Sequence, residues 1–129
     1  MNQFKIGEAA QLLGVSTDTM RRWADNGRCK AQRSVSGHRL VNGPDLARLA
    51  QELAEAPDDA DRTMSARNRF TGLVTKVTKD TVMAQVEMQA GPHRVVSLIS
   101  AEAVDALGLA PGVLAVAVIK ATNVVIERP

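Results

Sequence analysis

The sequence predicts an α+β protein of two small domains. The N-terminal domain is expected to be a winged helix-turn-helix, mainly α with a β-hairpin wing, and the C-terminal domain a small OB-like β-barrel with one short helix. Two observations carry this prediction: apolar residues recur at helical spacing between residues 6 and 53, and the spacing shifts toward two after residue 68. An acidic stretch headed by Pro57 lies between them. We therefore assign residues 1–56 and 65–129 to domains and residues 57–64 to an acidic linker.

Positive charge is concentrated in the first domain. Residues 1–48 carry eight Lys or Arg against four Asp or Glu, whereas residues 49–63 carry one against five and the remainder seven against five. The modest net charge of +2 therefore hides a basic head. Local positive charge attracts phosphate backbones, although a solvated surface is the plainer reading until a motif accompanies it.

The chain is expected to be cytoplasmic, without a membrane-spanning segment. Its lone Cys29 cannot form an internal disulfide, and neither a leader pattern nor a long apolar run opens the sequence. With no Tyr, two Phe and one Trp, the cores must be aliphatic. Small domains of this kind often depend on oligomerisation.

Two short helices joined by a tight turn are predicted first. Apolar residues from Ile6 to Leu13 follow helical spacing, and Gly14 stands where a left-handed residue ends a helix. Ser16 is a suitable N-cap for a second helix, which Asn26-Gly27 closes. Its outward side suits contacts to base edges and phosphates. The DNA-binding residues predicted here are Ser16, Thr17, Thr19, Arg21 and Arg22.

A basic hairpin and a third helix complete the first domain. Strands 30–33 and 38–41 flank a turn at 34–37, and Arg33, His38 and Arg39 are predicted to lie along DNA. Gly43-Pro44-Asp45 then starts a helix. Residues 4–53 resemble the winged-helix domain of MerR-type regulators and phage excisionases. The motifs are Ile6-Gly7-Glu8-Ala9-Ala10, Leu13-Gly14-Val15-Ser16, Arg21-Arg22-Trp23 and Gly37-His38-Arg39. MerR-type regulators continue into a long dimerisation helix, which is replaced here by Pro57-Asp58-Asp59-Ala60-Asp61, so dimerisation must come from elsewhere.

The second domain is predicted to contain five short strands, the last at Val124 to Glu127, and a helix at 101–107 between Ser100 and Gly108. A helix N-terminus at Ser100 attracts anions. Taken alone, each polar residue reads as a cap or a surface residue, but together they favour an oxyanion site. Its predicted members are Ser65, Arg67, Ser100 and Lys120, with backbone amides at Ala66 and Ala121.

Residues 65–127 are similar throughout to the Mop domain, a TOBE-like molybdate-binding module. The matching segments are Ser65-Ala66-Arg67-Asn68, Leu98-Ile99-Ser100, Leu107-Gly108-Leu109 and Ile119-Lys120-Ala121-Thr122. The resemblance implies that molybdate, or tungstate, is held at a subunit interface by Ser65, Arg67, Ser100 and Lys120. Ala103 departs from the pattern because a hydroxyl often stands there. A lost hydrogen bond to a charged group costs about 1.5–3 kcal/mol, or about ten- to a hundredfold in affinity.

These readings predict a molybdate-responsive transcriptional regulator that binds double-stranded DNA. A homo-oligomer, at least a dimer and up to a hexamer, is expected through the C-terminal domain. One alternative is an intracellular molybdate-storage protein whose helical head serves assembly; another is an excisionase-like architectural protein that uses the barrel only to oligomerise. Catalysis is not expected, because no nucleophile with a matching base and no phosphate loop is present. His38, His93 and Cys29 lack metal-ligand spacing.

Overall fold

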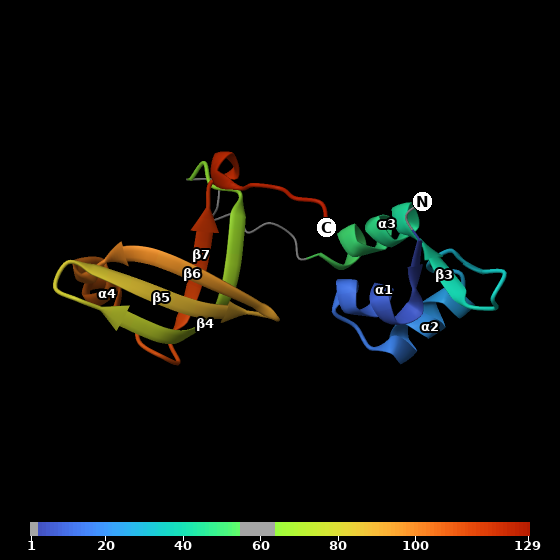
Figure 1. The fold of residues 1–129 in the computed structure, drawn as a ribbon, viewed down its shortest axis with the longest axis horizontal. Helices are drawn as coiled ribbons and strands as arrows, with labels where there is room; N and C mark the ends of the chain where they lie inside the picture. The colour runs from blue at the N-terminus through green and yellow to red at the C-terminus, as the bar shows by residue number, and fades with distance from the viewer. Residues whose placement is uncertain (1–2, 55–63) are drawn as a thin grey trace. The chain divides into compact units, whose positions relative to one another are not determined.

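A computed structural model describes residues 3–54 and 64–129, which form parts of two compact units, Met1–Ala56 and Pro57–Pro129 (Figure 1). The predicted linker, residues 57–64, lies almost entirely outside the described residues. None of the helices described is long and apolar enough to cross a membrane.

The N-terminal unit contains the predicted helices and hairpin. Its elements are β1 (Gln3–Lys5), α1 (Ile6–Leu13), α2 (Thr17–Asp25), β2 (Ala31–Arg33), β3 (Arg39–Asn42) and α3 (Gly43–Leu53). Strand β1 was not predicted, because three residues are too few to display a period of two. It pairs with β3, so the sheet has the order β1-β3-β2.

The predicted helix ends are confirmed. Gly14 ends α1 with a φ of 70°, and Ser16 caps α2 by accepting a hydrogen bond from the Thr19 N–H. The helices and β3 enclose one aliphatic core, whose largest fully buried members are Met20, Cys29, Val41 and Leu49. Burial, and then the nearby Asp45 carboxylate, raise the pKa of the Cys29 thiol, which therefore behaves as a core residue rather than a nucleophile.

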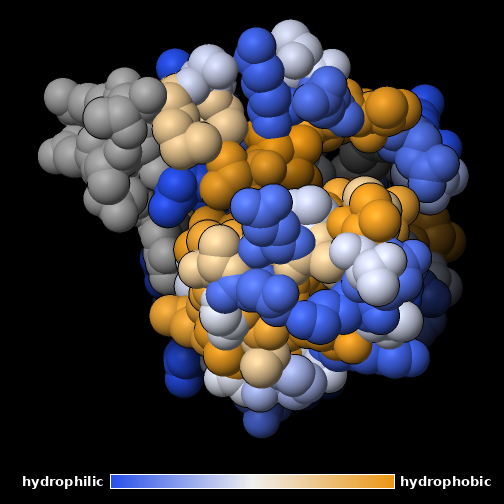
Figure 2. Space-filling model, turned by 90° about the vertical axis from the view of Figure 1, so that its left-hand side faces the viewer, coloured by the Kyte–Doolittle hydropathy of each residue, from blue (hydrophilic) through white to orange (hydrophobic). Residues whose placement is uncertain are grey.

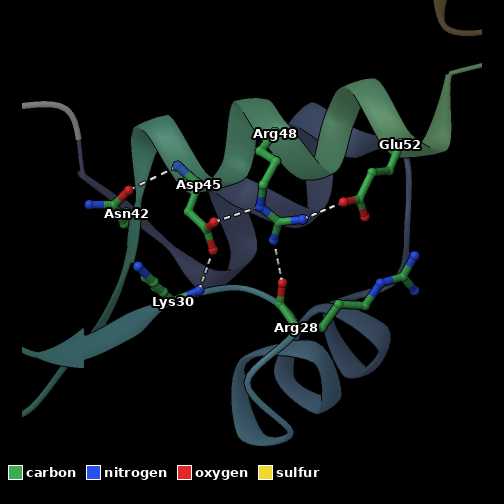
Figure 3. A network of polar contacts seen from close by, with 6 residues as sticks. All are labelled: Arg28, Lys30, Asn42, Asp45, Arg48 and Glu52. Atoms are coloured by element: carbon green, nitrogen blue, oxygen red, sulfur yellow. Dashed lines mark hydrogen bonds and ion pairs between the residues drawn. The ribbon is translucent and has the colours of Figure 1, made fainter.

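A polar network around Asp45 fastens α3 to the segment between α2 and β2 (Figure 3). The Asp45 carboxylate accepts hydrogen bonds from Arg48 Nε at 2.8 Å and from the Lys30 N–H at 2.6 Å. Arg48 also donates to the Arg28 carbonyl at 2.7 Å and pairs with Glu52. The hydrogen bond from the Arg48 side chain, followed by that from the Lys30 N–H, lowers the pKa of Asp45 from 3.8 to about 2. One acid thus positions the chain that leads into the wing.

The C-terminal unit is a curled antiparallel sheet with one α-helix. Its elements are β4 (Asn68–Lys79), β5 (Met83–Ala90), β6 (His93–Ser100), α4 (Ala101–Leu107), β7 (Leu114–Ile119) and the 3-10 helix η2 (Ala121–Asn123). The strand order is β6-β5-β4-β7. Gly72 lies within the long β4, where an added Cβ would lie 2.1 Å from the Gln89 carbonyl oxygen. Only glycine permits this close approach.

The predicted fifth strand, Val124 to Glu127, is wrong. These residues form no strand, and Val125 and Ile126 are 91% and 86% exposed. Val-Val-Ile favours a strand, but within the described residues the segment has no strand to pair with. Consequently β6 and β7 remain as open edges. An apolar gap of about 460 Å³, lined by β5, β6, β7 and Leu109, lies between them. Figure 2, which faces the left-hand side of Figure 1, shows hydrophobic patches among hydrophilic residues on that surface.

The Asp45 network yields a stability prediction. Asp45→Asn should lower the free energy of unfolding of the N-terminal unit by about 1–3 kcal/mol, because it removes the charge from two short hydrogen bonds. Since folding lowers the Asp45 pKa, this contribution is complete above about pH 4 and is lost as the pH falls toward about 2. The difference between the variant and the wild type should therefore narrow on acidification.

Urea unfolding of the full chain, followed by fluorescence of Trp23, measures this directly because Trp23 is the single Trp of the chain and packs against the N-terminal core. Glu52→Gln is the matched control, because it removes the charge of the other acid beside Arg48. The Glu52 side chain is 48% exposed, so this change should lower the free energy of unfolding by less than about 0.5 kcal/mol. Equal losses in the two variants would contradict the assigned role of Asp45.

Candidate functional site

The outward face of α2 carries the polar residues predicted to meet DNA. Met20 points into the core and anchors the helix, whereas Thr17, Arg21 and Arg22 are exposed. Ser16 and Thr19 are engaged with each other: the Thr19 N–H donates to Ser16 Oγ at 3.1 Å, and the Ser16 hydroxyl donates to Thr19 Oγ1 at 2.8 Å. These two hydroxyls therefore form the N-terminal cap of α2.

The wing between β2 and β3 holds its basic side chains in defined places. Arg33 Nη1 donates to the Gly37 carbonyl at 3.0 Å, and the His38 N–H donates to Ser34 Oγ at 3.2 Å. Arg39 Nη1 donates to Asp25 at the end of α2, at 2.5 Å. The turn is thus braced by its own polar groups.

Helix α2, whose outward side is predicted to contact DNA and which we call the recognition helix, borders one cationic cleft together with the wing. The cleft has a volume of about 290 Å³ and is lined by Lys5, Ile6, Arg21, Arg33, Gly37, His38 and Arg39. It therefore gathers four of the predicted DNA-binding side chains. Lys5 was not predicted; the available signal was a cation immediately before the first helix. A cleft with this many cationic donors suits a phosphate oxygen.

Five of the six residues predicted to hold an oxyanion meet at one end of the C-terminal sheet. Asn68, the first residue of β4, pairs with Ile119, the last residue of β7. The end of the segment Ser65–Arg67 therefore lies beside the start of the segment Lys120–Ala121. The Asn68 side chain joins them, because its Nδ2 donates to the Ile119 carbonyl at 3.1 Å. The predicted site omitted Asn68, although its side chain links these two segments.

The groups at this end differ in exposure and engagement. Ser65, Lys120 and Ala121 are exposed, and Ala66 is buried. Arg67 Nη1 donates to the Met64 carbonyl at 2.7 Å and to the Ala66 carbonyl at 3.3 Å, so the guanidinium stiffens its own loop. Lys120 immediately precedes η2, whose leading backbone N–H groups have no acceptor within the helix.

Ser100 lies apart from the other five residues. It pairs with Met83 at the start of β5, while Ala84 pairs with Lys79, the last residue of β4. Ser100 therefore stands at the end of β4 opposite Asn68, and twelve residues of strand at about 3.3 Å each separate the ends. Figure 1 shows α4 and η2 at different ends of the unit. One copy of the chain does not bring Ser100 and Lys120 to a common ion.

The Ser100 hydroxyl caps α4. Its Oγ accepts a hydrogen bond from the Ala103 N–H at 3.0 Å, which leaves the hydroxyl proton available for an outside acceptor. The same bond occupies the backbone N–H of Ala103, the position that lacks the expected hydroxyl.

These features define a helix-turn-helix unit and a small, curled β-sheet unit, and family comparisons agree. Residues 4–54 match the helix-turn-helix domain family, and residues 64–126 match the TOBE domain family. Molybdenum-pterin-binding protein 3 of Clostridium pasteurianum is 42% identical over 65 residues, which cover 50% of this chain and 96% of that protein. The chain therefore belongs to the TOBE-domain family of the molybdenum-pterin-binding proteins, and it carries a helix-turn-helix domain in addition.

Two further relatives extend the comparison. Molybdenum-pterin-binding protein MopA of Rhodobacter capsulatus is 39% identical over 67 residues, which are 51% of this chain but only 25% of MopA. The chain thus spans about a quarter of that relative. The cytoplasmic molybdate-binding protein ModG, solved with molybdate bound, is 40% identical over 56% of this chain and 52% of ModG, with a TM-score of 0.50. Both similarities concern about half of the present chain.

Proposed function

We propose that the protein is a molybdate-responsive, DNA-binding transcriptional regulator that works as a homo-oligomer. The observation that carries this proposal is the presence in one chain of a cationic cleft beside a helix-turn-helix and of a cationic oxyanion-type loop pair at Ser65–Arg67 and Lys120–Ala121. Tungstate, which closely resembles molybdate in shape, is a second candidate ligand. The predicted domain bounds, with an acidic tether at 57–64, form part of the proposal.

The C-terminal unit supplies the oligomer. The open edges of β6 and β7 and an apolar gap of about 460 Å³ expose unpaired backbone groups and apolar side chains, which is unfavourable for an isolated small domain. The exposed tail Val124–Ile126 has the β-branched residues that a missing strand requires. The tail of one copy fills the gap of another, and this exchange buries both apolar surfaces. A dimer is the smallest assembly that satisfies both copies.

The oxyanion lies between copies. Only η2 separates Lys120 from the tail, so a tail seated along the partner's β6 edge carries Lys120 toward the strand that ends at Ser100. The anion then receives the Lys120 ammonium, the loop at Ser65–Arg67 and the amide of Ala121 from one copy, and the Ser100 hydroxyl from the other. Charged donors at hydrogen-bonding distance suit a tetrahedral dianion.

The helix-turn-helix unit supplies DNA binding. Arg22 on the exposed face of α2 reads a base edge in the major groove, while the cleft lined by Lys5, Arg21 and Arg39 holds the adjacent phosphates. A single head makes few contacts, so useful affinity requires two heads on one operator. An anion that bridges two copies stabilises the paired state and therefore links ligand binding to DNA binding.

A storage protein with a helical assembly head is the alternative. It does not require a cleft of cationic side chains at the junction of α2 and the wing, and therefore the cleft favours regulation.

Calorimetric titration of the full chain with molybdate tests the ligand. We expect Lys120→Ala to weaken molybdate binding by about ten- to a hundredfold, because a charged donor is lost. Lys79→Ala is the matched control: it removes the same charge from the same unit, at an exposed ion pair with Asp105, and should leave the affinity unchanged. Sulfate, a smaller dianion, should bind more weakly to the wild type. Equal affinities in the two lysine variants would overturn the site.

Mixed assemblies test whether the site lies between copies. Ser100→Ala and Lys120→Ala should each weaken binding alone, whereas refolding the two variants together should restore tight binding at a fraction of the sites. In a mixed pair one interface receives both native groups and the other receives neither. Failure of the mixture to recover any tight site would contradict a shared site.

DNA binding is tested by selecting bound duplexes from a random pool and then measuring affinity by fluorescence anisotropy at several salt concentrations. Lys5→Ala should weaken binding to all sequences alike and reduce the salt slope by about one. Arg22→Ala should relax discrimination at one base position by about 1–3 kcal/mol. Arg94→Ala, in the C-terminal unit, removes an equal charge and is the control. A wild type with no affinity for duplex DNA at low salt would refute the regulator.

A further inference from the structure

Two carboxylates stand on the face of α2 that is proposed to meet DNA. Asp18, Arg21, Arg22 and Asp25 follow the spacing i, i+3, i+4, i+7, and all four are exposed. Carboxylates repel phosphate, so each of them lowers the affinity of this face for DNA of any sequence. Their presence on the recognition helix therefore requires a separate reason.

The two acids make different contacts. Asp18 pairs with Arg21 of the same helix at 3.4 Å, and its side chain is 94% exposed. Asp25 accepts a hydrogen bond from Arg39 Nη1 at 2.5 Å, and Arg39 lies on β3, the second strand of the wing. The Arg39 side chain is only 24% exposed. Among the residues that the structure describes, this is the ion pair that joins α2 to the wing.

The tip of the wing is closed by hydrogen bonds between its own residues. The Ser34 N–H donates to the His38 carbonyl at 2.7 Å, and the Gly37 N–H donates to the Ser34 carbonyl at 2.9 Å. Arg33 closes the same turn through the Gly37 carbonyl. Since the tip is held internally, its placement relative to α2 depends on contacts of the strand residues next to the turn, where Arg39, paired with Arg33, meets Asp25.

We infer that Asp25 is a positioning residue that makes DNA binding sequence-selective; this inference rests on the proposed function. By holding Arg39, Asp25 fixes the wing against the recognition helix, so that both elements reach a matching DNA site together. It also offsets one positive charge in the cleft, which reduces attraction to phosphates of any sequence. Both effects raise the ratio of specific to non-specific affinity.

The test compares Asp25→Asn, Asp25→Glu and Asp18→Asn with the wild type on two probes. One is the duplex selected by the wild-type protein, and the other is a random-sequence duplex of equal length. Asp25→Asn should bind the selected duplex about tenfold more weakly, with unchanged or tighter binding to the random duplex and a steeper salt dependence. Asp25→Glu, which keeps the carboxylate, should retain the wild-type ratio. Asp18→Asn changes the net charge equally but leaves the bridge to the wing intact.

A measurement without DNA separates positioning from charge. Amide relaxation by ¹⁵N NMR should show greater motion at wing residues 34–39 in Asp25→Asn and unchanged motion in Asp18→Asn. Unchanged wing amides in Asp25→Asn, or equal losses of selectivity in the two Asn variants, would overturn the inference. A protein that binds DNA with the same ratio in Asp25→Asn refutes this inference alone, whereas a wild type that binds no DNA refutes the proposed function and the inference with it.

Discussion

Strand β4 sets the constraint on which the C-terminal unit depends. Its first residue, Asn68, pairs with the last residue of β7. Its last residue, Lys79, pairs with Ala84 of β5, and β5 in turn pairs with β6, which ends at Ser100. The strand therefore keeps the proposed halves of an oxyanion site apart within one chain. The same curled sheet leaves the outer edges of β6 and β7 open and the tail after η2 exposed. Under the proposed function, a second copy of the chain both pairs the open strand edges and completes the oxyanion site.

The N-terminal unit is organised by charge as much as by its small core. Asp45 fastens α3 to the segment entering the wing, and Asp25 fastens the end of α2 to the strand leaving it. These two acids lie at opposite ends of the hairpin. The cationic side chains that line the cleft come from three separate elements, β1, α2 and the wing. Contact of all these cations with one phosphate group therefore requires each of the three elements to be correctly placed.

Local sequence patterns predicted the helices and their ends because those signals lie within a few residues. Gly14, Ser16, Ser100 and Gly108 each mark a helix boundary through backbone geometry or a single side-chain bond. The fifth strand was predicted wrongly because strand formation requires a partner, and Val124–Ile126 have none within the described chain. β1 was missed because it is too short for a pattern and is defined by its pairing with β3.

The composition of the candidate sites was partly predictable, whereas their grouping was not. Family resemblance indicated Ser65, Arg67, Ser100 and Lys120, but only the strand register reveals that Ser100 stands apart. Asn68 belongs to one of the motifs, but its hydrogen bond to the Ile119 carbonyl joins residues that are 51 positions apart in the sequence. Lys5 enters the cleft because β1 and α1 meet beside the wing. Each of these facts depends on contacts between residues distant along the chain.

The central claim is that anion binding between copies of the chain controls DNA binding by the paired heads. The most direct measurement is the dissociation constant of the protein for its selected duplex, at fixed protein concentration, with and without molybdate. We predict tighter DNA binding with molybdate, no such change with sulfate, and no response in the Lys120→Ala variant. Identical DNA affinity with and without molybdate, in a protein that demonstrably binds both, would contradict it.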